Sequence, residues 1–259
     1  MTAPMPMTTA RRVILILGVP GALATFAAFA YNAVAQTYQV GYHVHLSVPV
    51  SGQRVSVSID NADATITPGG GSRIAVNGTL RASLDRPAFG WHSTPAGLVL
   101  HSSCPLGYSG SCTMAYDIVV PGGLPVTVTD ANGNLTTSGL RGQITLSDGS
   151  GDITASGLTG TVRLSDDSGD ISVTSLAGTD VTGTEGSGDI TLTFTKVPLG
   201  VDVTAVSGDI TLILPRGPTA YQVRASSASG GVSDTLVRGL FSPHVIVASS
   251  GSGDVSIGY

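Results

Sequence analysis

Carboxyl groups recur at regular intervals in the second half of this 259-residue chain. Each follows the glycine of a repeated Ser-Gly-Asp motif, and together they form one column: Asp152, Asp170, Asp189, Asp209 and Asp254. Such a column could bind a cation or form an acidic binding face. A calcium β-roll, however, places Asp two residues after glycine, whereas here Asp follows directly. We therefore predict a structural turn column, in which each Asp accepts backbone amides within its turn, and no metal or cofactor.

Three further carboxyls could do acid–base chemistry. Asp166 and Asp167 are adjacent, and Asp148 lies 18 residues before Asp166. Paired carboxylates cleave glycosidic bonds, and some β-helical enzymes act on polysaccharides. These residues, however, stand in Asp-Gly-Ser-Gly and Asp-Asp-Ser-Gly segments, which are typical of turns. We interpret them as turn residues and predict no catalytic residue in the chain.

Other residues with chemical potential lie before the repeat. His43 and His45 share one face of a predicted strand, which suits two metal ligands. No third ligand is identifiable, so an exposed strand is the favoured interpretation. Ser, His and Asp are all present, but without a Gly-x-Ser-x-Gly elbow. Trp91 fits a cap or a contact surface better than catalytic machinery.

The only two cysteines, Cys104 and Cys112, enclose a short, turn-rich loop. In an oxidising compartment such a loop suits a disulfide. A metal pair or a catalytic thiol is the rival hypothesis, but there is no Cys-x-x-Cys motif and no fixed His beside either cysteine. We predict a disulfide.

The glycine before each marker defines an internal repeat. It occurs at Gly133, Gly151, Gly169, Gly188, Gly208, Gly230 and Gly253. The spacings of 18, 18, 19, 20, 22 and 23 residues lengthen slowly, which is typical of a tapering solenoid. Each coil is too small to fold alone, so neighbouring coils must bury its apolar face.

Side chains alternate on both sides of this glycine. Two residues after it stands an apolar column: Leu135, Ile153, Ile171, Ile190, Ile210, Val232 and Val255. A second alternating segment starts seven residues before it, with Val126, Ile144, Val162, Val181, Val201 and Val223. This period of two predicts two strands per coil. A column of Thr and Ser follows the first apolar column; it could meet ice or a glycan, but we interpret it as the ordinary solvent face.

These patterns predict an all-β fold, a parallel β-solenoid or β-helix-like stack of 18–23-residue coils, preceded by one N-terminal hydrophobic helix. A β-sandwich of successive hairpins is the alternative. The chain has one Lys and one Glu, which is too little material for solvent-facing helices. Three segments follow: 1–35 as a membrane anchor or signal peptide, 36–120 as an irregular β-rich cap, and 121–259 as the repetitive solenoid.

The N-terminus carries the features of a targeting signal. Two arginines precede an uncharged run from Val13 to Ala30, and all 17 acidic residues lie beyond it. Because a positive flank stays in the cytoplasm, we expect the rest to be exported. The length of the run favours an uncleaved single-pass anchor, with the C-terminal domain outside the cell membrane. An Ala-x-Ala pattern ending at Ala35 favours cleavage and secretion instead.

The exported part is acidic. Removing the two leading arginines from 12 basic residues leaves 10, against 17 acidic ones. Affinity for phosphate needs clustered Lys and Arg, so nucleic acid is excluded as a partner class.

Several features occur together in a known family. They are the basic-flanked N-terminal segment, the sequence Asp-Asn-Ala-Asp at 60–63, the loop from Cys104 to Cys112, and the Ser-Gly-Asp-Ile repeats at 150–153, 168–171, 187–190 and 207–210. In these features the chain resembles a bacterial family named "putative adhesin", a β-strand-repeat domain of unknown function common in actinobacteria. The pattern departs at Gly230-Gly231-Val232, where Asp is missing. The resemblance implies a β-solenoid-like ectodomain without an established biochemical role.

Two functional hypotheses remain. The first is a non-enzymatic, membrane-anchored surface module, adhesive or structural, with a cell-wall, glycan or surface-protein ligand. The second is a polysaccharide-active β-helical enzyme. An enzyme needs carboxylates that converge in a cleft, whereas a module can present uniform ladders of side chains. The repeat favours the module.

Overall fold

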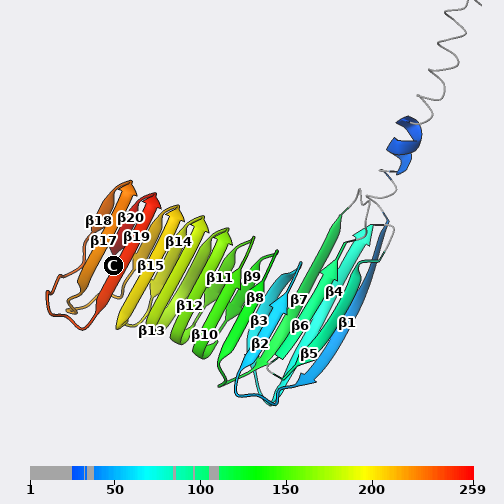
Figure 1. Cartoon of the computed structure of the whole chain (residues 1–259), viewed down its shortest axis with the longest axis horizontal. Coiled ribbons are helices and arrows are strands. Elements are labelled where there is room, and N and C mark those ends of the chain that lie inside the picture. The colour runs from blue at the N-terminus through cyan, green and yellow to red at the C-terminus, as the bar shows by residue number, and fades with distance from the viewer. Residues whose placement is uncertain (1–24, 32, 34–37, 84–85, 96, 105–110) are drawn as a thin grey trace, which may run out of the picture.

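The computed structural model describes residues 25–31, 33, 38–83, 86–95, 97–104 and 111–259. They form a short helix at 25–31 and an extensive array of β-strands (Figure 1). The strands before the repeat are β1 (Gln39–Pro49), β2 (Val55–Ile59), β3 (Asp63–Gly69), β4 (Arg73–Ser83), β5 (Ala88–Thr94), β6 (Gly97–Ser103) and β7 (Cys112–Pro121). Those of the repeat are β8 (Val126–Asp130), β9 (Leu135–Ser138), β10 (Arg141–Asp148), β11 (Ile153–Ser156), β12 (Thr159–Ser168), β13 (Ile171–Ser187), β14 (Ile190–Phe194), β15 (Gly200–Ser207), β16 (Ile210–Ile213), β17 (Gln222–Ser229), β18 (Val232–Asp234), β19 (Val245–Ser252) and β20 (Val255–Gly258).

One coil consists of two strands joined by a corner. Strand β10 ends at Asp148, a Gly-Ser-Gly corner turns the chain, and β11 starts at Ile153. Strands that precede a corner form a first sheet, and strands that follow it form a second. Neighbouring coils pair parallel and in register, with Ile144 beside Val162 and Ile153 beside Ile171. The predicted β-solenoid is confirmed; a sandwich of hairpins would pair its neighbouring strands antiparallel.

The strand order in space departs from the chain order at both ends of the stack. The first sheet runs β5–β6–β2–β8–β10–β12–β13–β15–β19–β17. The second runs β1–β4–β7–β3–β9–β11–β13–β14–β16–β20–β18. Strand β13 belongs to both because its 17 residues continue around a coil. The last coil of the chain, β19 with β20, is therefore inserted between the two coils that precede it (Figure 1).

This insertion corrects the interpretation of the longest repeat spacings as a taper. The linking segments 214–221 and 235–244 supply the extra residues, and the coil of β17 and β18 ends the stack. Val232 of β18 was predicted to be buried but is 48% exposed, because no coil of the described part of the chain covers it on the outer side. The other members of its apolar column are buried.

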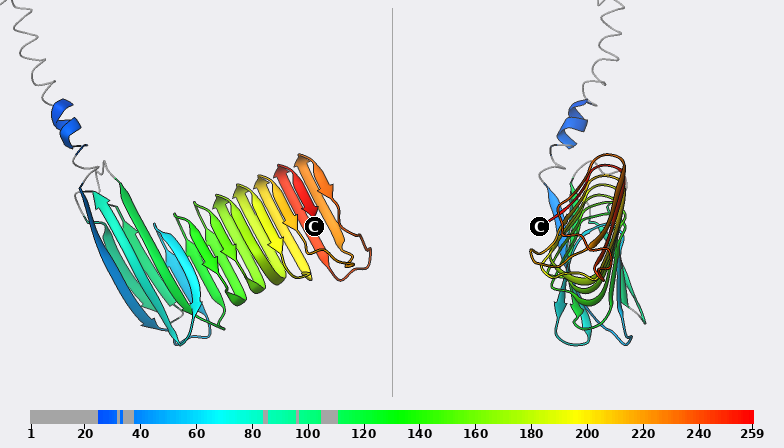
Figure 2. Two further views of the ribbon diagram at one scale, coloured as in Figure 1. Left: turned by 180° about the vertical axis from the view of Figure 1, so that it is seen from behind. Right: turned by 90° about the vertical axis from the view of Figure 1, so that its left-hand side faces the viewer.

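The strands before the repeat cover the opposite end. Strands β2 and β3, and then β6 and β7, extend the parallel stack, and β1, β4 and β5 add antiparallel strands beyond them. The first part of the chain thus begins the same stack and covers its edge. Seen along its length, the stack is a narrow, flattened tube of superposed coils (Figure 2).

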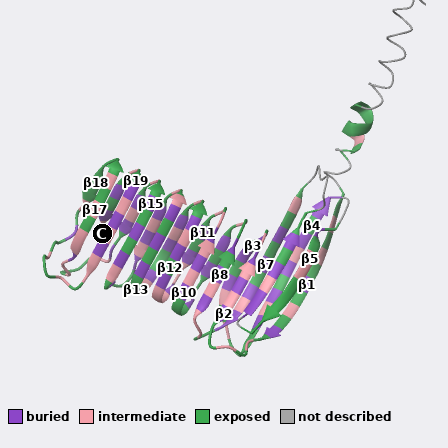
Figure 3. Cartoon of the chain, in the orientation of Figure 1, coloured by how far each residue is buried: buried purple, intermediate pink, exposed green. Residues whose placement is uncertain are grey.

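Aliphatic side chains fill the space between the two sheets, and buried and exposed residues alternate along the strands (Figure 3). The leucines at three early bends between coils point inward and are at most 1% exposed: Leu140, Leu158 and Leu176. The residues before them have positive φ: Gly139, Gly157 and Ser175. Each buried leucine contributes about 2 kcal/mol of transfer free energy, so the stack is held chiefly by its apolar columns.

The N-terminal expectations lie largely outside the described residues. The run from Val13 to Ala30 is described from residue 25 onwards, and the cleavage position at Ala35 is not among the described residues. Within the part of the chain that the structure describes, no helix has the length and apolar character needed to cross a membrane.

The corner glycine is required because neighbouring corners approach closely. A Cβ on Gly151 would lie 2.0 Å from the carbonyl oxygen of Gly133, and the φ angle of Gly151 is 141°. The corner glycines of the five later coils meet the same obstacle: Gly169, Gly188, Gly208, Gly230 and Gly253. The recurrence of glycine in the sequence therefore reflects the stacking of backbone on backbone.

We expect Gly151→Ala to lower the free energy of unfolding by more than about 2 kcal/mol, because the methyl group must displace the backbone of the adjacent coil at an unfavourable φ. Gly217→Ala is the matched control, since nothing lies within 4 Å of a Cβ at that position. Chemical denaturation measures both. A Gly151→Ala midpoint equal to that of the wild type would contradict this explanation of the repeat.

Candidate functional site

Each central corner of the solenoid carries carboxyl groups at two positions. Asp148 continues the inward phase of Ile144 and Leu146, whereas Asp152 precedes the inward Ile153 and points outward. The inward positions form what we call the inner column: Asp130, Asp148, Asp166 and Glu185. The outward positions form the outer column: Asp63, Asn134, Asp152, Asp170, Asp189, Asp209 and Asp254.

The outer column is a hydrogen-bond ladder between coils. The backbone N–H of Asp189 donates to Oδ1 of Asp170 at 2.9 Å. The other steps repeat this bond at 2.7–3.0 Å. The sequence predicted that each Asp accepts an amide within its own turn; the accepted amide instead lies 18 to 71 residues away. The outward side chain reaches an amide of the adjacent coil because the coils stack in register on either side of it.

The two ends of this ladder show which side-chain group each of its hydrogen bonds requires. Gly231 donates its N–H to Oδ1 of Asp254 at 2.7 Å, and it lies in the terminal coil, where no further amide needs an acceptor. Asn134 takes the place of Asp near the other end and still accepts through its Oδ1. A side-chain oxygen, with or without charge, therefore satisfies the next coil.

The inner column is buried, with 2–3% of each residue exposed. One carboxyl oxygen accepts the N–H two residues later, at 3.1 Å for Asp148 with Ser150 and for Asp166 with Ser168. Asp130 and Glu185 do the same. These bonds agree with the turn role predicted for Asp148 and Asp166. The second oxygen of all four carboxyls is buried and has no hydrogen-bond partner among the residues that the structure describes.

Burial raises the pKa of every carboxyl in the inner column. Desolvation is the largest cause and the charge of the neighbouring carboxyl adds to it, so that the pKa rises to about 7 for Asp130 and Glu185 and to about 6 for Asp166. Desolvation also raises the pKa of Asp148. Two charges one coil apart, at about 4.8 Å, repel by roughly 3 kcal/mol at an effective dielectric constant near 20. Full ionisation of the column is therefore unfavourable.

The structure brings Asp148 and Asp166 side by side, but not as a catalytic pair. They are neighbours in register and are enclosed between the sheets, whereas Asp167 points outward and is exposed. Acid–base catalysis on a glycoside requires both carboxyls to contact the sugar. Their enclosure prevents that contact.

His43 and His45 lie on the exposed face of β1, as predicted. Nδ1 of His43 is 3.3 Å from Oγ1 of Thr79, and Nδ1 of His45 is 2.8 Å from Oδ1 of Asn77. Among the residues that the structure describes, no three His, Cys, Asp or Glu side chains are grouped so that they could hold a metal ion.

Cys104 and Cys112 form the predicted disulfide, with their Cα atoms 6.1 Å apart. The bond ties the end of β6 to the start of β7, which belong to one coil near the N-terminal end of the stack. Trp91 lies nearby on β5, the outermost strand of the first sheet, and is 47% exposed. Both features therefore belong to the cap.

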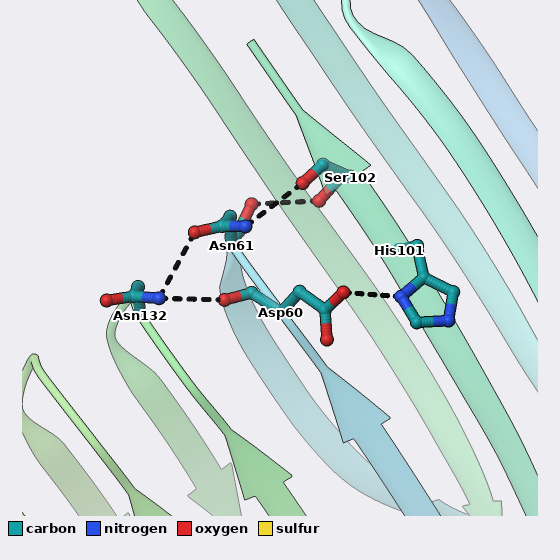
Figure 4. A network of polar contacts seen from close by, with 5 residues as sticks. All are labelled: Asp60, Asn61, His101, Ser102 and Asn132. Carbon is teal, nitrogen blue, oxygen red and sulfur yellow. Dashed lines mark hydrogen bonds and ion pairs between the residues drawn. The ribbon is translucent and has the colours of Figure 1, made fainter.

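A polar cluster that the sequence did not reveal joins three coils at the N-terminal end (Figure 4). The carboxylate of Asp60 pairs with Nδ1 of His101, and Nδ2 of Asn132 donates to the carbonyl oxygen of Asp60 at 3.2 Å. The Oγ of Ser102 donates to the carbonyl oxygen of Asn61 at 2.8 Å and is directed away from His101. The cluster thus has the Asp and His of a Ser-His-Asp set, while its serine is engaged elsewhere. No signal in the sequence connects these residues, which lie up to 72 positions apart.

Fold and corner together define a β-solenoid protein with two carboxyl columns along one edge. The family described as Toastrack DUF4097 matches residues 124–258, which is more than half of the chain. The chain belongs to this family, a domain of unknown function.

Three solved structures are similar to this chain. The structure titled as a "putative adhesin" from Parabacteroides merdae is 9% identical, covers 82% of this chain and 95% of its own, and has a TM-score of 0.46. Another so titled, from Bacteroides fragilis, is 12% identical with coverage of 84% and 97% and a TM-score of 0.39. A "putative cell adhesion protein" from Clostridium sporogenes is 13% identical with coverage of 85% and 99% and a TM-score of 0.37. Likeness at this level carries no argument about what this chain does. No curated protein matches the sequence.

The outer ladder predicts a difference between two substitutions at one position. Asp170→Ala removes the acceptor of the Asp189 amide, and we expect it to lower the free energy of unfolding by about 1 kcal/mol. Asp170→Asn keeps the oxygen, as Asn134 does, and should lose less than half as much. Urea unfolding followed by circular dichroism measures both variants. Equal losses would show that the charge of the column matters more than its acceptor oxygen.

Proposed function

We propose that this protein is a non-enzymatic, extracytoplasmic surface module, held at the membrane by its N-terminal segment and presenting the far end of its solenoid to a partner. The observation that carries the proposal is an exposed apolar tip at the end of the stack remote from the N-terminal helix (Figure 1). We define the tip as residues 235–244, the segment that joins β18 to β19.

The tip is fixed in place while its largest apolar side chains face solvent. Phe241 is 99% exposed and Leu240 is 85% exposed. The backbone N–H of Tyr221 donates to the carbonyl oxygen of Val237, and the backbone N–H of Gly239 donates to that of Tyr221. The Oγ of Ser242 donates to the carbonyl oxygen of Ala220 at 2.6 Å. Two adjacent large apolar side chains, both at least 85% exposed on an anchored loop, support a contact role.

The chemistry of the tip fits a surface-protein ligand better than the other two candidate classes. A phenyl ring beside a branched aliphatic side chain is best covered by an apolar protein surface. Among the described residues, β17 and β18 each pair with a strand on one side only, and a partner strand can add to such an edge. Cell-wall and glycan ligands are the alternatives. A polysaccharide-active enzyme has less support, because its candidate carboxyls are enclosed.

Replacing both apolar side chains tests this proposal. We expect Leu240→Ser/Phe241→Ser to reduce binding of the full chain to protein extracted from the host cell surface at least tenfold, because truncating central apolar contacts typically costs over 1 kcal/mol each. Ile213→Ser, on the side of the rod and 37% exposed, is the control. Pull-down and surface plasmon resonance provide the measurement. Binding that is unchanged in the tip variant would refute the tip as the contact site, and binding to purified wall or glycan alone would favour those ligand classes.

Anchoring needs a separate test. We expect the native protein to sediment with the membrane fraction and to retain its N-terminal hydrophobic segment. N-terminal sequencing of the protein recovered from its host measures this. A soluble protein starting at Gln36 would instead establish secretion after cleavage at Ala35 and remove the membrane from the proposed function.

A further inference from the structure

The inner column places four carboxyls where adjacent coils carry apolar side chains. Ile59 is in register with Asp130 at one end, and Ala205 with Glu185 at the other, and each is 1% exposed. The turn at each corner uses one oxygen of each carboxyl. The other four carboxyl oxygens are buried and have no hydrogen-bond partner among the described residues: Oδ2 of Asp130, Asp148 and Asp166, and Oε2 of Glu185.

The last two coils show what this position can do when it carries a donor. There the column continues with serine, and Oγ of Ser227 donates to the carbonyl oxygen of Gly253 at 2.7 Å, while Oγ of Ser250 donates to that of Gly208 at 2.8 Å. In both cases the acceptor is the corner carbonyl of the adjacent coil. A hydroxyl at this position therefore joins one coil to the next.

The unpartnered oxygen of Asp166 occupies the equivalent place. A Cβ built on Gly169, the corner glycine of the same coil, would lie 3.2 Å from this oxygen of Asp166. The same point lies 1.9 Å from the carbonyl oxygen of Gly151 in the adjacent coil. For Ser227 the corresponding distances are 2.9 Å and 2.2 Å, the latter to the carbonyl oxygen of Gly253. Two oxygens that face each other across a buried corner attract only if one of them carries a hydrogen, and a carboxylate has none to donate.

The charges around the column do not favour its ionised form. The acidic groups outside the column that act on it are Asp63, Asp152 and Asp170 of the outer column. The buried phenol of Tyr116 also lies near Asp130, whose charge raises the pKa of this phenol. The basic residues on β10 and β12, Arg141 and Arg163, are exposed on the outside. Among the described residues, no basic side chain forms an ion pair with the inner column.

We propose that the inner column is a proton-binding site, in which carboxyls held as neutral acids donate their O–H to the corner carbonyl of the adjacent coil. These hydrogen bonds, which we call the clasp, hold the central coils together. When the pH rises, the O–H bond breaks, the proton passes to water, and a buried carboxylate is left facing a carbonyl oxygen. The clasp then opens. The site acts on the stability of the stack and does not depend on the proposed surface function.

The direction of the pH dependence follows from the raised pKa values. An acid whose pKa is higher in the folded than in the unfolded chain stabilises the fold fully below its unfolded pKa, near 4, and loses that contribution as the pH rises through its folded pKa. With folded values of about 6 to 7 for Asp130, Asp166 and Glu185, the loss falls between about pH 4 and about pH 7.

Thermal unfolding of the full chain in mild detergent tests the proposal. We expect the wild-type midpoint to fall by about 5–10 °C between about pH 5 and about pH 8. Asp148→Asn/Asp166→Asn keeps the corner acceptor and supplies a permanent N–H donor at two of the four positions, so its fall should be smaller than that of the wild type. Asp167→Asn, adjacent but exposed, is the control and should follow the wild type. A flat wild-type profile, or an equal fall in the double variant, would overturn the proposal.

A second measurement does not depend on the variant folding. Infrared difference spectra of the wild type in heavy water at about pH 6 should show the C=O band of protonated carboxylic acids, which ordinary exposed carboxyls have lost at that pH. This band should disappear as the pH rises to about 8. Its absence at about pH 6 would show that the column is ionised and the clasp does not exist.

Discussion

Parallel, in-register stacking governs this protein, because it places each residue directly against its equivalent in the adjacent coil, at about 4.8 Å. For an aliphatic side chain the arrangement is favourable, since every neighbour in the column excludes water in the same way. For the backbone, the arrangement leaves no room for a side chain at the corners, where the carbonyl oxygen of Gly133 occupies the place that a Cβ of Gly151 would need. For charged groups it sets like against like. The main features of the molecule are responses to these three consequences.

The two carboxyl columns show how strongly the consequence depends on the side of the corner. On the outside, water screens the charges, and each oxygen of the ladder satisfies an amide of the next coil, so repetition costs little. On the inside, Asp148 and Asp166 are enclosed with one oxygen unpartnered, and desolvation raises the pKa of both. Within one corner, the outer-column Asp thus connects two coils, whereas the inner-column Asp, four residues earlier, is a buried acid.

The ends of the stack face the opposite problem, since a terminal coil has no neighbour. At one end antiparallel strands and the disulfide cover the first coils. At the other, the chain runs past its neighbour to form the terminal coil and then returns to fill the gap with β19 and β20. The terminal coil lacks the Asp of the ladder at Gly231 and leaves Val232 half exposed. The segment that joins these last two coils carries Leu240 and Phe241, whose side chains face solvent.

The sequence by itself determined the class of fold, the two strands per coil and their inward apolar columns, because stacking forces similar residue types to recur at one period, and a period is visible in one dimension. It also indicated the disulfide, because its only two cysteines enclose one short loop. Only the tertiary structure decided the order of the last coils, the partner of each ladder Asp, the enclosure of the inner column and the pairing of Asp60 with His101. These depend on which segment lies adjacent in space. A repeat whose coils are nearly equivalent does not encode that choice, since each coil offers its neighbours the same columns.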